Sequence, residues 1–275
     1  MDLGIKGRKA VICASSQGLG LACATALARE GCEVFINGRD AARLATAKAQ
    51  IEKELGTGGA ANNGADSGAS SGARIHTVAA DITTEAGRKT LFDACPEADN
   101  LVNNNAGPPP GKLEDWHHDA WIAALESNML APILLIRAFI PGMRARKFGR
   151  IVNITSAMVK SPRPHMALST TARTGLTAFS KSLSLDAAVD NVTINNLLPE
   201  RIDTPRQAFM AERMMKAQNI DMTEARRRIT ETVAAKRFGL PSEFGDACAF
   251  LCSAQAGFMS GQNLQLDGGS YHGLI

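Results

Sequence analysis

Three side chains that could take part in proton transfer lie in the segment HMALSTTARTGL, residues 165–176. His165, Ser169 and Arg173 are spaced i, i+4, i+8, which places them on one helix face if the helix begins just after Pro164. An imidazole with a pKa of about 6.5 is a competent acid at neutral pH. A serine hydroxyl is a far weaker acid, and an arginine stays protonated. We predict a relay through His165 and Ser169, or a neighbouring water. The alternative is a solvent-facing His165 in the Pro-Arg-Pro-His loop.

The elements that must position these groups follow a regular order. Short apolar runs that read as strands occupy residues 9–14, 32–37, 74–80, 100–104, 150–155, 192–198 and 263–267. Stretches with apolar residues three and four apart lie between them, at 18–30, 40–55, 115–145, 165–188 and 242–253. Strict alternation of strand and helix indicates parallel strands joined by helical crossovers. The predicted fold is α/β, one doubly wound parallel sheet (a Rossmann fold) over residues 1–275, with helices on both faces.

Composition excludes several classes of protein. The 275 residues are 45% hydrophobic and 21% charged, and the formal net charge of +3 is too small to indicate binding to nucleic acid or to a membrane surface. The N-terminus lacks the plan of a signal peptide, and no uninterrupted apolar run reaches membrane-spanning length. None of the six cysteines forms a C-x-x-C pair and no histidine has metal-ligand spacing, so we expect no metal, reduced buried thiols and a cytoplasmic location.

Two segments stand apart from the strand–helix rhythm. Residues 56–73 contain no large apolar side chain and predict a flexible surface loop, with a substrate lid as the less favoured reading. Residues 205–234 predict substrate-lid helices. Within them Met210, Met214 and Met215 would form an adaptable apolar lid, or else an ordinary buried stripe.

A glycine-rich turn follows the first predicted strand. In CASSQGLGLACATALAREG, small residues at the entry to a helix would let the backbone approach a pyrophosphate at the helix N-terminus. The second strand ends in FINGRD, with Asn37 at the expected acidic position and Arg39 two residues later. A guanidinium suits a 2′-phosphate, so NADP (NADPH) is favoured over NAD. Alternatively, Arg39 is a solvated loop residue and Asp40 caps the next helix.

Taken together, the motifs resemble those of the short-chain dehydrogenase/reductase superfamily, in particular its 3-oxoacyl-acyl-carrier-protein reductase-like branch. The resemblance covers nearly the whole chain and rests on the order and spacing of its motifs. They are the glycine loop, Asp81-Ile82, NNAG at 104–107, SN at 127–128, IVNITS at 151–156, NNLLPERIDTP at 195–205 and the segment 236–269.

The resemblance implies a role for each matching position. Pyrophosphate would lie on Ser15, Gly18, Leu19 and Gly20, the adenine on Asp81 and Ile82, and the adenosine side on Asn104, Asn105, Ala106 and Gly107. Pro199, Ile202 and Thr204 would hold the nicotinamide carboxamide and the phosphates, and Arg173 the nicotinamide ribose. The resemblance also implies a homo-oligomer, a tetramer or dimer packed through 115–145, 165–188 and the C-terminal strand.

The same resemblance identifies the catalytic positions and shows where this chain departs from the family pattern. Asn128 matches the asparagine that anchors a water relay, and Ser156 the serine that binds the substrate carbonyl. Thirteen residues beyond Ser156 the family has its catalytic tyrosine, with lysine four further on, and this chain has Ser169 and Arg173. We therefore expect an NADP-dependent oxidoreductase of carbonyl or alcohol substrates with a modified tetrad. A catalytically silent dinucleotide-binding protein, a sensor or partner subunit, is the alternative.

Further departures surround this expected site. Ala14 stands where the family loop has glycine, Asn103 replaces an apolar strand residue, and Glu200 replaces the glycine of a Pro-Gly pair. Glu200 would repel an anionic substrate, hold a polar one, or point to solvent. A third possible function is dehydration or isomerisation in the same pocket, using Glu200 or His165. Arginines that would attract an anionic substrate, or lie at the surface, are Arg163, Arg201 and Arg206.

Overall fold

Seven parallel strands form one sheet in the computed structural model, which describes residues 1–56 and 74–274. The strand order is β3-β2-β1-β4-β5-β6-β7. The chain adds β2 and β3 on one side of β1 and adds β4 to β7 on the other side, so the order of addition changes direction between β1 and β4. The predicted doubly wound fold is confirmed, and each predicted strand is found. The bounds are β1 Lys9–Ile12, β2 Glu33–Gly38, β3 Ile75–Ala79, β4 Asn100–Asn103, β5 Gly149–Ile154, β6 Val192–Pro199 and β7 Asn263–Leu266.

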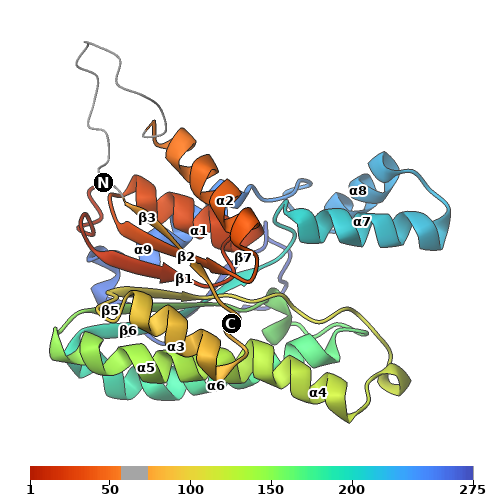
Figure 1. The fold of residues 1–275 in the computed structure, drawn as a ribbon. Helices are drawn as coiled ribbons and strands as arrows, with labels where there is room; N and C mark the ends of the chain where they lie inside the picture. Colours follow the sequence, from red (N-terminus) through yellow and green to blue (C-terminus); the bar gives the residue numbers. More distant parts are fainter. Residues whose placement is uncertain (57–73, 275) are drawn as a thin grey trace.

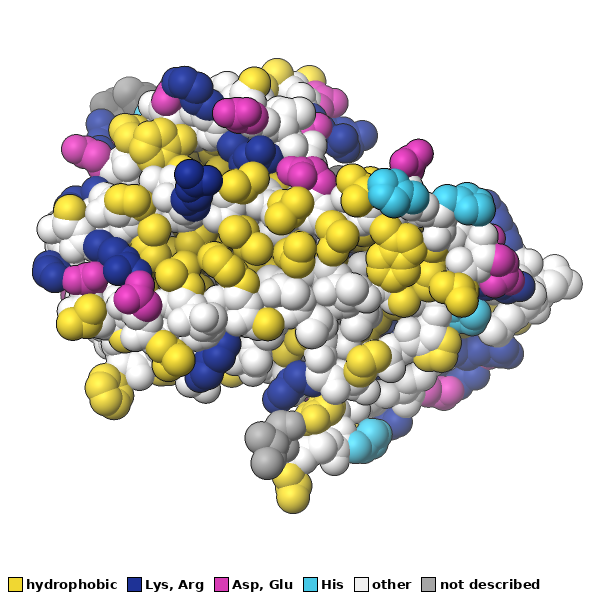
Figure 2. Space-filling model, turned by 90° about the horizontal axis from the view of Figure 1, so that it is seen from below, with side chains coloured by type: hydrophobic (Ala, Val, Ile, Leu, Met, Phe, Trp, Pro, Cys, Tyr) yellow, Lys and Arg dark blue, Asp and Glu magenta, His cyan; other side chains and the backbone are white. Residues whose placement is uncertain are grey.

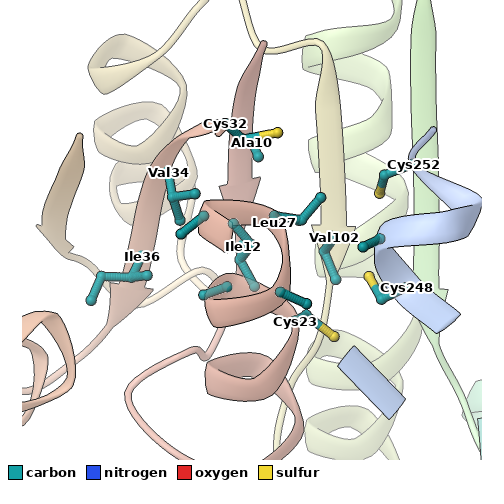
Figure 3. Packing of buried hydrophobic residues seen from close by; sticks show 14 of the residues in the cluster. Ala10, Ile12, Cys23, Leu27, Cys32, Val34, Ile36, Val102, Cys248 and Cys252 are labelled. Atoms are coloured by element: carbon teal, nitrogen blue, oxygen red, sulfur yellow. The ribbon is translucent and has the colours of Figure 1, made fainter. Parts of the chain in front are cut away.

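Helices cover both faces of this sheet (Figure 1). One face carries α1 (Gly18–Arg29), α2 (Ala41–Glu54) and α9 (Pro241–Leu251), and their apolar side chains form one core with β1 and β2. Figure 3 shows Cys23 and Leu27 of α1 opposite Cys248 of α9 and Cys252, which directly follows α9, in this core. The other face carries α3 (Glu85–Ala94), α5 (Ala131–Ala145) and α6 (Ala167–Ala187) over a second core. All six cysteines are buried free thiols, as expected.

Local sequence signals explain where several helices begin. The Asp40 side chain accepts hydrogen bonds from the backbone N–H groups of Ala42 and Arg43, and it caps α2. Thr84 caps α3, a helix that the apolar spacing alone did not single out, through the N–H of Gly87. The predicted loop at 56–73 lies, from residue 57 on, outside the described residues.

The long helical region predicted at 115–145 consists of three joined segments. These are α4 (His118–Leu125), the π-helical turn η2 (Glu126–Leu130) and α5. Among the described residues, His118–Ala145 is the one helical stretch long and apolar enough to cross a membrane by length and composition, and 39% of its most apolar window is buried in the protein. Core helices of globular proteins meet the same criterion.

Three buried asparagines and the exposed Asn263 link four neighbouring strands. Asn103 of β4 donates to Asn153 of β5 (2.8 Å), Asn153 donates to Asn196 of β6 (3.2 Å), and Asn196 donates to Asn263 of β7 (2.9 Å). Each pair is in register across the parallel sheet. The buried amide of Asn103 thus finds its partners in a ladder that ties together the strand ends beneath the site.

Two helices, α7 (Pro205–Gln218) and α8 (Met222–Glu231), project from the body of the molecule (Figure 1). Ala211, Ala225 and Ile229 form a small core between them, and Met214 and Met215 pack against it. Met210 instead lines the cleft described below. Met214 and Met215 are thus partly buried in packing between the two helices, and the lid role stays a prediction.

Candidate active site

A cleft of about 1300 Å³ opens at the carboxyl ends of the strands. Its wall comes from the β1–α1 loop, the ends of β2 to β6 and the first turns of α6 and α7. This is where doubly wound sheets bind ligands, because the chain reverses direction between β1 and β4. The predicted site residues that line it are Gly18, Leu19, Asn37, Arg39, Asp81, Ile82, Asn104, Asn105, Ala106, Gly107, Ser156, His165, Ser169, Arg173, Pro199, Ile202 and Thr204.

The β1–α1 loop keeps a left-handed backbone at two positions. Ala14 has φ 45° and Gly18 has φ 60°. A Cβ at Gly18 would meet only Thr204, at 3.8 Å, so the space above this turn is open. A Cβ at Gly20 would instead lie 2.4 Å from the Ala14 carbonyl oxygen. Gly20 therefore permits α1 to approach the turn, whereas Gly18 and Leu19 face the cleft.

The side chains of Ser15 and Asn104 hold this loop in place through hydrogen bonds. The Ser15 hydroxyl donates to the Ile12 carbonyl (2.8 Å) and accepts from the Asn37 N–H (2.9 Å), and the residue is fully buried. The Asn104 amide donates to the Ala14 carbonyl (3.1 Å). Ser15 therefore shapes the loop rather than facing the cleft.

The end of β2 differs in detail from the sequence interpretation. The Asn37 amide is buried and donates to the carbonyls of Val78 and Ala80, both at 3.0 Å, so it clamps β2 to β3. Gly38 also lines the cleft, and a Cβ there would lie 3.5 Å from both the Ser16 hydroxyl and the Leu44 side chain, which is ordinary van der Waals contact. Sequence reasoning missed Gly38, although it directly precedes the exposed Arg39. Arg39 and the helix cap Asp40 both line the cleft, so capping and phosphate binding are compatible.

Asp81 follows the end of β3, the strand that pairs with β2 at Gly38. Its carboxylate accepts hydrogen bonds from the Thr83 backbone N–H (3.0 Å) and hydroxyl (2.7 Å). Burial alone would raise its pKa, but these hydrogen bonds and the charge of Arg39 outweigh burial and lower the pKa of Asp81. The carboxylate is therefore ionised and fixed in orientation.

Asn128 lies in the π-helical turn between α4 and α5. Its amide donates to the Ala106 carbonyl (3.3 Å) and to the Ser127 hydroxyl (2.7 Å), and its Oδ1 is buried with no hydrogen-bond partner within the described part of the chain. Single π turns inside α-helices often mark functional sites. Asn128 lies just behind the cleft wall, where an unpartnered acceptor suits the predicted water relay.

Arg173 carries a buried positive charge at the base of the cleft. Its guanidinium donates to the carbonyls of Ile154 (2.7 Å), Thr155 (3.1 Å) and Asn105 (3.3 Å) and to the Ser169 hydroxyl (3.3 Å). It forms no ion pair among the described residues. Burial lowers the pKa of Arg173 to about 10, so it stays protonated at neutral pH.

The two serines at this base are held in the same way. Ser169 Oγ accepts from Arg173 Nε, and Ser156 Oγ accepts from the Met158 backbone N–H at 3.2 Å. Because each oxygen already accepts an N–H, each hydroxyl keeps its own hydrogen to donate into the cleft. Two polarised hydroxyl donors therefore face the same space.

The predicted helix face through His165 is wrong. Helix α6 begins at Ala167, and His165 lies before it with a left-handed backbone, φ 64°. Its carbonyl accepts a hydrogen bond from the Gly111 N–H at 3.0 Å, which holds the chain outside the helix. The exposed His165 still lines the cleft, but at its rim.

Glu200 is buried beside the cleft with two arginines. Arg163 and Arg201 each approach its Oε1, at 3.1 Å and 3.2 Å. The two arginines share one carboxylate oxygen of the protein, so this cluster keeps one positive charge in excess. The reading of Glu200 as pointing to solvent is wrong, because its side chain is only 7% exposed.

Comparison with known proteins defines the class of this site. The family described as "Enoyl-(Acyl carrier protein) reductase" matches residues 13–271. The chain therefore belongs to this family of short-chain dehydrogenases/reductases, and the resemblance to the superfamily is confirmed.

Individual relatives match over their full lengths. The chain is 31% identical over 273 residues to the uncharacterized oxidoreductase YvaG of Bacillus subtilis, covering 98% of each. It is 27% identical to the 3-oxoacyl-[acyl-carrier-protein] reductase FabG of Aquifex aeolicus, covering 98% of this chain and 100% of the relative. The structure of L-sorbose reductase from Gluconobacter frateurii, complexed with NADPH and L-sorbose, matches with a TM-score of 0.89, 29% identity and full coverage of both chains.

Proposed function

We propose that this protein is an NADP-dependent oxidoreductase that transfers a hydride between nicotinamide and a carbonyl or alcohol substrate, with a modified catalytic tetrad. The observation that carries the proposal is the pair of polarised hydroxyls, Ser156 and Ser169, beside the buried cation Arg173 at the base of the cleft. Relatives and structural neighbours support the cofactor, since L-sorbose reductase was crystallised with NADPH. Residues 1–275 would act as one domain, with residues 205–234 as the lid.

The residues of the cleft fit such a dinucleotide. The turn at Gly18, which has open space above it, would carry the pyrophosphate on its N–H groups. Arg39 would bind the 2′-phosphate, Asp81 and Ile82 the adenine, and Thr204 the carboxamide side. A bound nicotinamide supplies the hydride.

Replacing Arg39 by alanine tests the choice of cofactor. Without the guanidinium, the charge-assisted hydrogen bonds to a 2′-phosphate are lost, and we expect the Kd for NADPH to rise by about 10- to 100-fold. The Kd for NADH should change less than about twofold, because NADH lacks that phosphate. Both constants follow from fluorescence titration. Arg29→Ala, at an arginine outside the cleft that pairs with Asp246, is the matched control. Failure of the wild-type protein to bind either nucleotide would defeat the proposal.

The chain's own groups would act on the carbonyl oxygen. Ser156 and Ser169 would donate their hydroxyl hydrogens to it, and the charge of Arg173 would stabilise the negative charge that develops there. Arg173 cannot act as a proton donor near neutral pH, since even the lowered pKa of about 10 keeps it charged. The proton must therefore come from water on Asn128 Oδ1 or from the cleft rim.

His165 is one ionisable group at that rim, and His165→Ala tests whether it delivers the proton. If it does, we expect kcat to fall by about 100-fold. His118→Ala, at an exposed histidine on α4 outside the cleft, should leave kcat unchanged. An unaltered kcat in His165→Ala would remove His165 from the mechanism and leave the Asn128 water as the source.

A catalytically silent dinucleotide-binding protein remains the second candidate, because all four contacts of Arg173 are made within the protein. Nucleotide binding without turnover by any variant would favour it.

The cytoplasmic location and the homo-oligomer also stay predictions. Figure 2 shows apolar side chains gathered over the helices below the sheet. Exposed large apolar side chains on the helices α4 and α6 and the turn η2 are Ile122, Leu185 and Leu130, and subunit packing covers side chains of this kind.

A further inference from the structure

Three arginines at the substrate end of the cleft repel one another. Arg206 and Arg213 lie on α7, with their guanidinium carbons 5.5 Å and 5.9 Å from the ring centre of Phe209. The charge of Arg213 adds to burial in lowering the pKa of Arg206, and Arg206 does the same to Arg173. None of the three forms an ion pair with any described residue. The cleft thus holds unbalanced positive charge.

Arg206 places positive charge close to Ser169 and Arg173 at the base of the cleft. Its guanidinium reaches across the cleft and donates to the Pro108 carbonyl at 3.3 Å, directly after Gly107. A Cβ at Gly107 would lie 3.4 Å from Arg173 and 3.5 Å from Ser169. Arg206 therefore lies on the same side as the two hydroxyl donors, whereas Arg39 lies at the opposite, adenosine end.

Nearby acidic groups do not pair with these arginines. Glu200 is already paired with Arg163 and Arg201. Asp115 lines the cleft and accepts the Lys112 backbone N–H at 2.8 Å, and it forms no ion pair with Arg206 or Arg213. The stacking on Phe209 and the bond to Pro108 hold the Arg206 guanidinium in place while leaving donors for an anion.

We propose that the substrate is a small oxo or hydroxy acid whose carboxylate binds Arg206, with Arg213 at the rim, while its carbonyl or hydroxyl lies at Ser156 and Ser169. This inference rests on the proposed function, since it names the substrate class of the same site. Among the arginines expected to attract an anion, it retains Arg206 and excludes Arg163 and Arg201, which face Glu200.

The test compares acetoacetate with its uncharged methyl ester in calorimetric titrations of the NADP⁺-saturated protein. With the cofactor oxidised, neither ketone can be reduced, so binding alone is measured. We expect acetoacetate to bind the wild-type protein at least about 10-fold more tightly than the ester, a difference of about 1.4 kcal/mol. Arg206→Met should remove that preference, while Arg137→Met, at an exposed arginine of α5, should keep it.

Other outcomes overturn the inference. Equal binding of the two ketones, or binding of neither, would show that the cleft does not select a carboxylate. A weaker Kd for NADP⁺ in Arg206→Met, with acetoacetate unaffected, would assign Arg206 to the cofactor phosphates instead. Repeating the titration without nucleotide separates the two proposals. If NADP⁺ does not bind but acetoacetate still binds through Arg206, the proposed function fails and the carboxylate site at Arg206 stands.

Discussion

A double variant, Ser169→Tyr with Arg173→Lys, is expected to reduce small ketones at least about 100-fold faster than the wild-type protein. A tyrosine has a pKa near 10, which an adjacent ammonium lowers toward neutrality, whereas a serine hydroxyl is a far weaker acid. The new tyrosine would face the space that Ser169 faces, opposite the Ser156 hydroxyl. Turnover of NADPH with acetoacetate and methyl acetoacetate measures the gain.

The single variants are the controls for this gain. Ser169→Tyr alone keeps the buried guanidinium of Arg173, and Arg173→Lys alone lacks a phenol, so each should gain much less than the pair. The Kd for NADPH shows whether the double variant still binds the cofactor. A folded double variant that binds NADPH and yet reduces neither ketone faster than wild type would contradict the view that the missing phenol limits turnover.

The sheet could be predicted from the sequence because each strand is a short apolar run bounded by polar or glycine residues. The buried asparagines did not obscure this pattern, since Asn153 lies between Val152 and Ile154, and Asn103 follows the apolar pair Leu101-Val102 at the end of its strand. The position of the turn at Gly18 and Leu19 on the cleft could be predicted as well, because a strand followed by glycines and a helix defines the place of that turn.

Details of the site depended on contacts between distant residues. The start of α6 at Ala167 is set by the bond between His165 and Gly111, 54 positions apart in number, and no local signal reveals it. In a strand with both faces buried, alternation does not tell which of Asn37 and Gly38 faces the ligand. The pairing of Arg163 with Glu200 likewise required the fold, since the two lie on separate loops.

The asparagine ladder yields the largest expected effect on stability, in the variant Asn153→Leu. Asn153 accepts from Asn103 and donates to Asn196 and to the Ser180 hydroxyl (2.9 Å), all within the core. Leucine would leave the Asn103 amide and the Asn196 carbonyl oxygen buried without these partners. Since each such group costs about 1–3 kcal/mol, we expect a loss of about 3 kcal/mol or more in the free energy of unfolding, measured by urea denaturation.

A matched control comes from the next strand. Thr193 on β6 is also buried, but its hydroxyl has no hydrogen-bond partner among the described residues. Thr193→Val removes a polar group that gains nothing from burial, so stability should stay level or rise. Equal losses in Asn153→Leu and Thr193→Val would show that packing, and not the amide ladder, decides the cost. A loss of unfolding free energy in Asn153→Leu alone would mean that the ladder stabilises the strand ends that carry Ser156 and the carbonyl groups bound by Arg173.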